Sequence, residues 1–226
     1  MIQIIGLNKN YGSKEVLKGI SYDFEPGLVH GIVGENGAGK TTFFKCIAGL
    51  ERFDGDIKSD VYPIKNHLGL LETNPQFMSK ITGWEYLKLI CSARKIQVDN
   101  FIEQNVFDLP LDEYAENYST GMKKKLALTG LLLQNNDLFI LDEPFNGVDI
   151  HSNILINEII NKLKQAGKTL LISSHIFSTL NDSCDEIHLL KEGRFIKHAK
   201  KDSFDALNKQ MQQFVIGDKL DKLLIK

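Results

Sequence analysis

A glycine-rich segment near the start of the chain carries residue types that bind phosphate. Residues 33–42, Val-Gly-Glu-Asn-Gly-Ala-Gly-Lys-Thr-Thr, fit the pattern G-x-x-x-x-G-K-[ST]. Glycines allow tight turns with positive φ, so that consecutive backbone N–H groups can point at one anion. In this pattern the lysine reaches the β- and γ-phosphates, and the hydroxyl of the next residue ligates Mg²⁺. The expected contacts come from Gly34, Asn36, Gly37, Gly39, Lys40, Thr41 and Thr42.

The segments on either side favour a nucleotide site over a glycine turn that happens to precede a helix. Residues 28–33 form a short apolar run typical of a buried strand, and residues 41–50 have apolar side chains at helical spacing. Strand, loop and helix in this order bring the positive end of the helix dipole to the anion. By composition alone the motif should arise in only about one chain in a hundred of this length. We therefore expect this loop to hold a nucleotide.

A second candidate is a pair of carboxylates after an apolar run. Residues 138–141, Leu-Phe-Ile-Leu, are typical of a strand buried on both faces, and Asp142 and Glu143 follow directly. Active-site groups gather at the carboxyl ends of parallel strands, and the Mg²⁺ held by Thr41 needs a carboxylate as well. Adjacent strand residues point to opposite faces, so only one of the two can serve the metal. We assign Asp142 to Mg²⁺ and Glu143 to the water molecule that attacks the γ-phosphate.

Two single residues could complete such a site. His175 follows a strand predicted at 169–173, where a lone histidine is often structural but where its neighbours are the other strand ends. Tyr11 lies in a polar turn predicted at 8–13, between a strand at 2–7 and an alternating run through 20–24. It either closes the end of a small antiparallel sheet or offers a platform on which a planar base stacks.

The segment Tyr118-Ser-Thr-Gly-Met122 precedes a helix predicted at 123–133, with Ser119 as its N-cap. Lys123, Lys124 and Lys125 open that helix. We interpret them as a solvated turn, although cations in a first turn oppose the helix dipole and would suit an approaching anion.

Composition limits the remaining classes. The chain has 226 residues and a net charge of -2, which argues against a general polyanion binder. Its three cysteines are far apart, as expected for reduced thiols in a cytoplasm. We find no apolar run of the ~18 residues that a membrane span needs.

The other segments give weaker signals. We expect short strands around 57 and 67–71, a helix that buries Trp84, Leu87, Ile90 and Cys91, and loops or short helices over 100–117. A helix is predicted over 148–163 and a hairpin over 186–199. The tail, 200–226, has Phe204, Leu207, Met211 and Phe214 at helical spacing and should pack back on the domain.

Taken together, these segments resemble the nucleotide-binding subunit of an ABC transporter. Six motifs of that family occur in order: the aromatic loop, Walker A, the signature, Walker B, the D-loop and the switch histidine. They correspond to Tyr11, residues 34–42, 118–122, 138–143, 146–149 and 173–175. The form of the signature and the short chain are most similar to the ATPases of ABC-2-type exporters.

The resemblance implies an α/β P-loop NTPase fold with a RecA-like core, an N-terminal antiparallel β subdomain and an inserted helical subdomain near 76–135, all within one domain spanning 1–226. It also implies a head-to-tail dimer in which each ATP lies between the P-loop of one subunit and the signature of the other. Ser119 and Gly121 would then contact the γ-phosphate in trans, His175 would contact it in cis, and Asp149 would couple the two sites. Lys40, Glu143 and His175 would be catalytic.

The chain departs from the family pattern at two places. The usual Gly-Gly of the signature is Thr120-Gly121, and its usual leucine is Tyr118. The glutamine that senses Mg²⁺ and the membrane partner is replaced by Thr73, with Glu72 beside it. Either Glu72 or Thr73 could take over the role of that glutamine, and one hypothesis is that Glu72 supplies the Mg²⁺-side or water contact.

By this resemblance the protein uses ATP and Mg²⁺, pairs with itself or another ATPase subunit, and drives export through a separately encoded transmembrane permease. It would lie on the inner face of the cell membrane and bind no nucleic acid. The alternatives are a soluble ABC ATPase acting on DNA or ribosomes, and a small-molecule kinase, which would have no use for residues 118–122.

Overall fold

The computed structural model describes residues 1–98 and 100–216, with the backbone alone described for 213–216. A three-stranded antiparallel sheet has the order β2-β1-β4, and a six-stranded sheet has the order β5-β6-β7-β3-β8-β9. In the larger sheet β9 is antiparallel to β8 and the other pairs are parallel. The strands are β1 (Ile2–Tyr11), β2 (Lys14–Phe24), β3 (Val29–Val33), β4 (Asp54–Ser59), β5 (Leu68–Leu71), β6 (Leu138–Asp142), β7 (Thr169–Ser174), β8 (Glu186–Lys191) and β9 (Arg194–Lys200).

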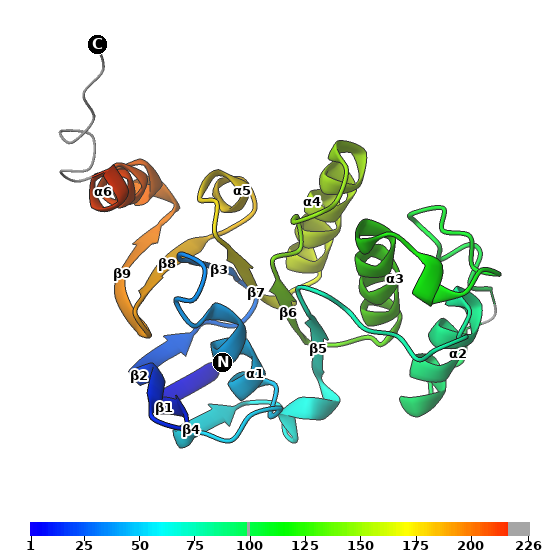
Figure 1. Ribbon diagram of the computed structural model, residues 1–226, viewed down its shortest axis with the longest axis horizontal. Helices are drawn as coiled ribbons and strands as arrows, with labels where there is room; N and C mark the ends of the chain where they lie inside the picture. The colour runs from blue at the N-terminus through cyan, green and yellow to red at the C-terminus, as the bar shows by residue number, and fades with distance from the viewer. Residues whose placement is uncertain (99, 217–226) are drawn as a thin grey trace, which may run out of the picture.

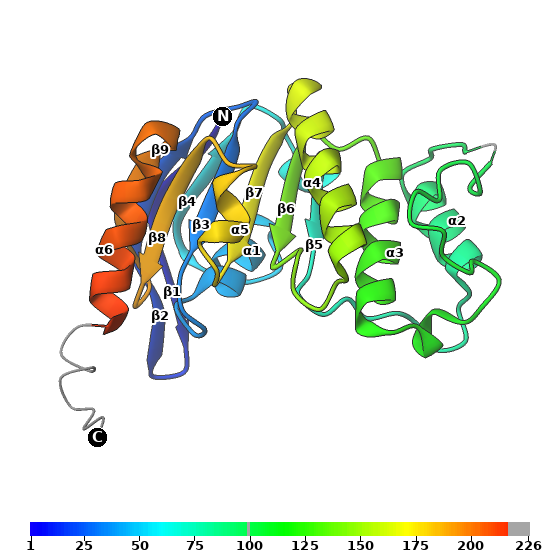
Figure 2. The same ribbon diagram turned by 90° about the horizontal axis from the view of Figure 1, so that it is seen from above.

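Helices cover both faces of the larger sheet (Figure 1). They are α1 (Lys40–Ile47), α2 (Gly83–Ala93), α3 (Thr120–Leu133), α4 (Ile150–Gln165), α5 (Ser178–Asn181) and α6 (Phe204–Ile216). The helix α1 packs on one face together with the small sheet, whereas α4, α5 and α6 pack on the other (Figures 1 and 2). The helices α2 and α3 extend the molecule beyond β5 (Figure 2).

Alternating side chains explain this layering. Along β6, Phe139 and Leu141 enter the core under α3 and α4, while Leu138 and Ile140 enter the core shared by α1 and the small sheet. Successive strand residues point to opposite faces, so a strand covered on both sides is buried at every position and is mostly apolar. The continuous apolar runs of β3, β6 and β7 therefore mark the centre of the fold, as the sequence predicts.

Two predictions about secondary structure and packing are wrong. Residues 8–11 belong to β1 and not to a turn, because bulges between Leu7 and Asn10 break the alternation while the strand goes on pairing. Trp84 is 37% exposed, although Leu87 and Cys91 on the same helix are buried. It lies in the first turn of α2, where its ring packs edge-on against Phe101 at 4.9 Å between centroids.

The other elements follow the predictions closely. The expected strands and hairpin are present, and Ser119 caps α3 by accepting a hydrogen bond from the Met122 N–H at 3.2 Å. Phe204 and Leu207 of α6 are buried against the sheet, while the side chain of Phe214 and all of 217–226 lie outside the described residues. A separate helical subdomain at 76–135 stays a prediction. Within 1–98 and 100–216, no helix has the length and apolar character that crossing a membrane requires.

Candidate functional site

The parallel strands bring the predicted chemistry to one edge of the larger sheet. The P-loop follows β3, the carboxylates end β6, and His175 follows β7. The strands β6, β7 and β3 are neighbours in that order, so three segments far apart in sequence meet at their carboxyl ends.

The P-loop glycines are required for two different reasons. Gly39 has φ of 110° at the N-terminus of α1, in the left-handed region that side chains other than glycine avoid. Gly34 is needed for close approach, because a Cβ there would lie 2.4 Å from the carbonyl oxygen of Leu190. The loop therefore packs closely against β8, directly before the start of α1.

Asp142 accepts three hydroxyl hydrogen bonds. Thr41 Oγ1 and Thr73 Oγ1 donate to Oδ2 at 2.6 and 2.7 Å, and Ser173 Oγ donates to Oδ1 at 2.5 Å. Asp142 is 1% exposed. A buried carboxylate with several donors is held in one orientation. The pairing of Thr41 with Asp142, predicted from Mg²⁺ chemistry, is present in the structure.

Glu143 faces the P-loop from the other side. Its Oε1 lies 3.2 Å from Lys40 Nζ, and its Oε2 accepts a hydrogen bond from His175 Nδ1 at 2.9 Å. Because an ionised carboxylate can only accept, Nδ1 carries the histidine proton in this arrangement. Lys40 Nζ also donates to the carbonyl of Gly34 at 2.8 Å. The structure therefore brings the three predicted catalytic residues into one contact network.

The backbone of Glu143 is unusual. Its φ is +53°, a left-handed conformation that costs of order 1–3 kcal/mol for a residue with a side chain. Its N–H donates to Ser173 Oγ at 2.9 Å, and its carbonyl accepts from Lys124 Nζ at 2.7 Å. These contacts hold a turn that directs the carboxylate away from β6 and towards Lys40.

Lys124 corrects the prediction that 123–125 form a solvated turn. Its side chain is 1% exposed and donates to the carbonyls of Glu143 and Asn146, both at 2.7 Å. Burial lowers the pKa of its ammonium group, and the nearby carboxylates oppose that shift. Lys124 lies four residues before Leu128, on the buried face of α3. This spacing could have identified it as a buried lysine.

A cavity of about 820 Å³ lies over the P-loop. Its lining includes Tyr11, Asn36, Gly37, Gly39, Lys40, Thr41, Thr42, Thr73, Glu143, Asn146 and His175. Tyr11 is 45% exposed at the end of β1, and Lys9 Nζ lies 4.6 Å from its ring centroid. An exposed aromatic ring at the rim of this cavity can accept a planar base, so the position of Tyr11 is compatible with base stacking.

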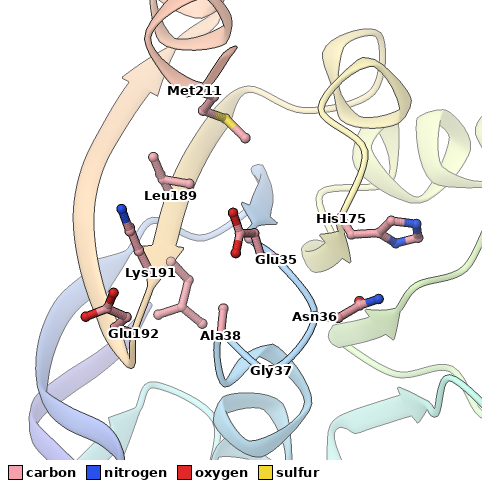
Figure 3. Close-up of a pocket in the computed structure, with 11 residues that line it drawn as sticks. Glu35, Asn36, Gly37, Ala38, His175, Leu189, Lys191, Glu192 and Met211 are labelled. Atoms are coloured by element: carbon pink, nitrogen blue, oxygen red, sulfur yellow. The ribbon is translucent and has the colours of Figure 1, made fainter. Parts of the chain in front are cut away.

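A second, smaller cavity of about 250 Å³ lies on the other side of the loop. Figure 3 shows Met211 of α6 and Leu189 of β8 opposite the P-loop residues Asn36 and Gly37. Gly34 lines this second cavity and not the larger one. The P-loop therefore has one side that faces the larger cavity and one side that faces β8 and α6.

The signature residues lie elsewhere. Among the described residues, those lining the large cavity do not include Ser119, Gly121 or Asp149. Ser119 and Gly121 are at the N-terminus of α3. Asp149 caps α4, accepting hydrogen bonds from the N–H and hydroxyl of Ser152, which hold the pKa of its carboxyl below the usual range. Within a single chain these three residues are separate from the phosphate cavity.

Thr73, and not Glu72, reaches the metal-side carboxylate. Thr73 Oγ1 contacts Asp142, whereas Glu72 Oε1 lies 3.5 Å from Lys45 Nζ on α1 and its side chain is 43% exposed. Of the two residues that could replace the missing glutamine, the geometry favours Thr73 over Glu72. Sequence spacing placed Thr73 correctly, but nothing in it showed which of the two neighbours faces inward. Ser173 is a further contact that the sequence analysis missed.

Comparisons with known proteins show the family of the chain. The family model described as ABC transporter matches residues 17–146. The bacitracin transport ATP-binding protein BcrA of Enterococcus faecalis is 28% identical over 231 residues, covering 96% of this chain and 75% of its own length. The uncharacterized ABC transporter ATP-binding protein YcbN of Bacillus subtilis is 31% identical over 229 residues, covering 95% and 74%.

Solved structures give the same result. A structure described as the ATP binding subunit of an ABC transporter superposes with a TM-score of 0.79 at 26% identity, over 93% of each chain. The structure of cbiO1 from Clostridium perfringens, described as part of the ABC transporter complex cbiONQ, has a TM-score of 0.72 at 25% identity, over 97% of this chain and 96% of its own. The predicted P-loop NTPase fold is confirmed.

Proposed function

The chain belongs to the ABC transporter family, as an ATP-binding and ATP-hydrolysing subunit, and on this premise we propose how its own residues carry out that reaction. One observation carries the proposal: Lys40 and Thr41 of the P-loop meet Asp142 and Glu143 at the carboxyl edge of the sheet. A cation, a hydroxyl and two carboxylates in contact are the groups that phosphoryl transfer from a nucleotide requires.

The donor set around Thr41 fits a magnesium ion. Thr41 Oγ1 and Asp142 Oδ2 are both oxygens and lie 2.6 Å apart. Adjacent ligands of octahedral Mg²⁺ are about 2.9 Å apart, given metal–oxygen distances of about 2.0–2.1 Å. We therefore assign Thr41 and Asp142 to the metal, with Thr73 orienting Asp142. The bound ion would neutralise charge that develops on the phosphate oxygens.

Glu143 and His175 form the water-activating pair in this proposal. When a γ-phosphate takes Lys40 as its counterion, Glu143 loses that partner and becomes available to a water molecule. The carboxylate accepts the water proton as the water oxygen bonds to the γ-phosphorus and the bond from that phosphorus to the bridging oxygen breaks, which releases ADP. His175 holds the other carboxylate oxygen. The P-loop N–H groups and Lys40 bind the phosphates, and Tyr11 stacks on the base.

The second half of the site comes from a paired subunit. Ser119 and Gly121 carry the N-terminus of α3, whose N–H groups suit a phosphate. Since they do not line the cavity of their own chain, we propose that they contact the γ-phosphate bound to a second copy or a related subunit. Asp149, next to this segment through Lys125 at 3.4 Å, would couple the two sites.

We further propose that hydrolysis drives export through a separately encoded membrane subunit, with this chain on the inner face of the membrane. The likeness to BcrA of Enterococcus faecalis, whose name states bacitracin transport, supports a transport role. It also favours transport over the alternative of a soluble machine acting on DNA or ribosomes. No nucleic-acid partner is part of this proposal.

Co-purification from membranes tests the partnership. The tagged chain is expressed in its native host, membranes are solubilised in detergent, and bound proteins are identified by mass spectrometry. We expect one polytopic membrane protein in stoichiometric amount, and ATP hydrolysis in the purified complex. Recovery of ribosomes or DNA-bound proteins without a membrane protein would contradict the transport proposal.

A further inference from the structure

Three residues with metal-binding side chains share one face of the larger sheet, away from the P-loop. His30 lies on β3, and Glu186 and His188 lie on β8; His30 is the direct cross-strand neighbour of Glu186. A period of two places all three on the face that looks towards the small sheet. His30 is four residues before Gly34, about 13 Å along an extended strand, so this cluster is separate from the nucleotide site.

The cluster is fully enclosed. His30 and His188 are 0% exposed and Glu186 is 3% exposed. Their ligand atoms lie within 4.8 Å of one another. Aromatic rings surround them: the ring centroid of Tyr22 is 4.5 Å from that of His188, and that of Phe24 is 5.1 Å from that of His30. Polar groups buried in such surroundings need partners.

The hydrogen bonds of His30 leave a lone pair facing a carboxylate. Its Nε2 lies 2.9 Å from the carbonyl of Glu25, an acceptor, so this nitrogen carries the proton. Its Nδ1 has no hydrogen-bond partner and lies 3.4 Å from Glu186 Oε2. Two electron-rich atoms therefore face each other, an arrangement that a cation between them would stabilise.

His188 lacks hydrogen-bond partners even more completely than His30 does. Neither of its ring nitrogens has a hydrogen-bond partner, and Nε2 lies 3.9 Å from Glu186 Oε2, too far for a hydrogen bond. Both nitrogens of a fully buried imidazole are thus unsatisfied, which native proteins rarely tolerate. One nitrogen of each histidine and one oxygen of Glu186 converge on the same small volume.

The spacing matches a metal site better than a hydrogen-bonded network. A tetrahedral zinc ion bound at about 2.0–2.1 Å places its ligand atoms about 3.4 Å apart. The observed separations from Glu186 Oε2 are 3.4 and 3.9 Å. Metal-bound histidines also commonly donate their second N–H to a backbone carbonyl, as His30 does to Glu25.

We propose that His30, Glu186 and His188 form a binding site for a transition-metal dication of the zinc type, which ties β3 to β8. Two nitrogens and one carboxylate oxygen are a known zinc ligand set, whereas Mg²⁺ and Ca²⁺ prefer oxygen ligands alone. The site would be structural, because none of its three residues is among those lining the nucleotide cavity.

Other polar groups around the cluster are compatible with this role. Tyr22 OH donates to Glu186 Oε2 at 3.2 Å. Lys200 Nζ lies 3.4 Å from the other oxygen, Oε1, and its side chain is 70% exposed, so water screens its charge. His198 on β9 stacks on His188 with ring centroids 6.0 Å apart but is exposed and lies outside the ligand set. It provides a matched control.

Metal titration of the full chain tests the proposal. The protein is stripped with a chelator, kept free of nucleotide, and titrated with Zn²⁺ against a chromophoric competitor while its melting temperature is followed. We expect one tightly bound equivalent and a higher melting temperature. Co²⁺ should give the visible bands of a tetrahedral site with nitrogen and oxygen ligands, without thiolate charge-transfer bands.

Variants locate the bound ion. Glu186→Gln keeps the side-chain size, and His188→Phe suits the aromatic surroundings. Each should weaken Zn²⁺ binding at least about 10-fold, since even loss of an outer hydrogen-bond partner costs about 10–100-fold. His198→Phe should bind as the parent does, and so should His67→Phe, which removes a half-buried histidine paired with Asp137 at 2.8 Å. The proposal is overturned if the parent binds no Zn²⁺, if Glu186→Gln binds it as tightly as the parent, or if only His67→Phe loses it.

Discussion

The P-loop region and the signature region hold the two sets of residues that are expected to meet on ATP, but they are built differently. Around the P-loop every catalytic side chain is packed against another: Lys40 on Glu143, Thr41 on Asp142, and His175 on Glu143. Around the signature, Ser119 and Asp149 cap their own helices and stay exposed, and Asp149 also pairs with Lys125 at 3.4 Å. One region is complete in a single chain. The other exposes helix N-termini to solvent, as expected of half of a site that a partner subunit completes.

The largest expected effect is in the complete region. Lys40→Ala removes the cation from the β- and γ-phosphates and should lower turnover by about 10³-fold or more, the scale seen when one cation is lost from a phosphoryl-transfer site. ATP affinity should fall as well. Lys45→Ala is the control, because it removes the same charge from the same helix outside the cavity. Unchanged binding and hydrolysis in Lys40→Ala would remove the P-loop from the mechanism.

The next largest effect should come from a negative charge in the signature region. Aspartate caps a helix as well as serine does, so Ser119→Asp should leave α3 folded. A carboxylate facing the γ-phosphate should lower ATP turnover about 10²-fold, comparable to losing a transition-state donor. Ser119→Asn has the same size and capping ability without the charge. If Ser119→Asp hydrolyses ATP as fast as Ser119→Asn does, Ser119 does not face phosphate.

A mixture of the two inactive variants separates action in cis from action in trans. In a head-to-tail dimer, a Lys40→Ala chain supplies an intact signature to the intact P-loop of a Ser119→Asp chain. Mixing them should restore a fraction of parent ATPase activity, while each alone stays inactive. No restoration at any mixing ratio would favour a complete site within one chain.

A smaller effect distinguishes the two residues at the missing glutamine. Thr73→Val removes one hydroxyl from Asp142 while keeping the side-chain shape, and a hydrogen bond of this kind contributes about 0.5–1.5 kcal/mol. We expect the Mg²⁺ concentration for half-maximal ATPase activity to rise up to about 10-fold. Glu72→Gln should change it little, because Glu72 contacts Lys45 and not Asp142. If Glu72→Gln raises this Mg²⁺ concentration and Thr73→Val does not, Glu72 is the metal-side residue.

The last expected effect is on stability and not on activity, at the junction of the two regions. Lys124→Met leaves the carbonyls of Glu143 and Asn146 without their buried donor, which should cost about 1–3 kcal/mol. Lys123→Met, at the less buried neighbouring position, should cost much less. Urea unfolding with an unchanged m-value measures both. Equal losses would mean that the Lys124 contacts contribute no net stability.

The sequence predicts the complete region far better than the half-site. Gly39, Lys40 and Asp142 could be assigned because phosphate and magnesium chemistry fix both residue type and spacing, and continuous apolar runs locate the strands that carry them. The inward turn of Lys124 was missed because three lysines in a row resemble a solvated face. The choice between Glu72 and Thr73 depends on the backbone after β5, which no residue pattern specifies.

The most direct test of the account is the oligomeric state of Glu143→Gln in Mg-ATP. Loss of the water-activating carboxylate should lower hydrolysis about 10²–10⁴-fold. ATP binding should be equal or tighter, because a negative charge near the γ-phosphate is removed. Size exclusion with light scattering should then find the variant as a dimer, while the parent protein runs mainly as a monomer. A Glu143→Gln protein that stays monomeric at saturating ATP would contradict the pairing of P-loop and signature, and one that hydrolyses ATP at the parent rate would contradict the role of Glu143.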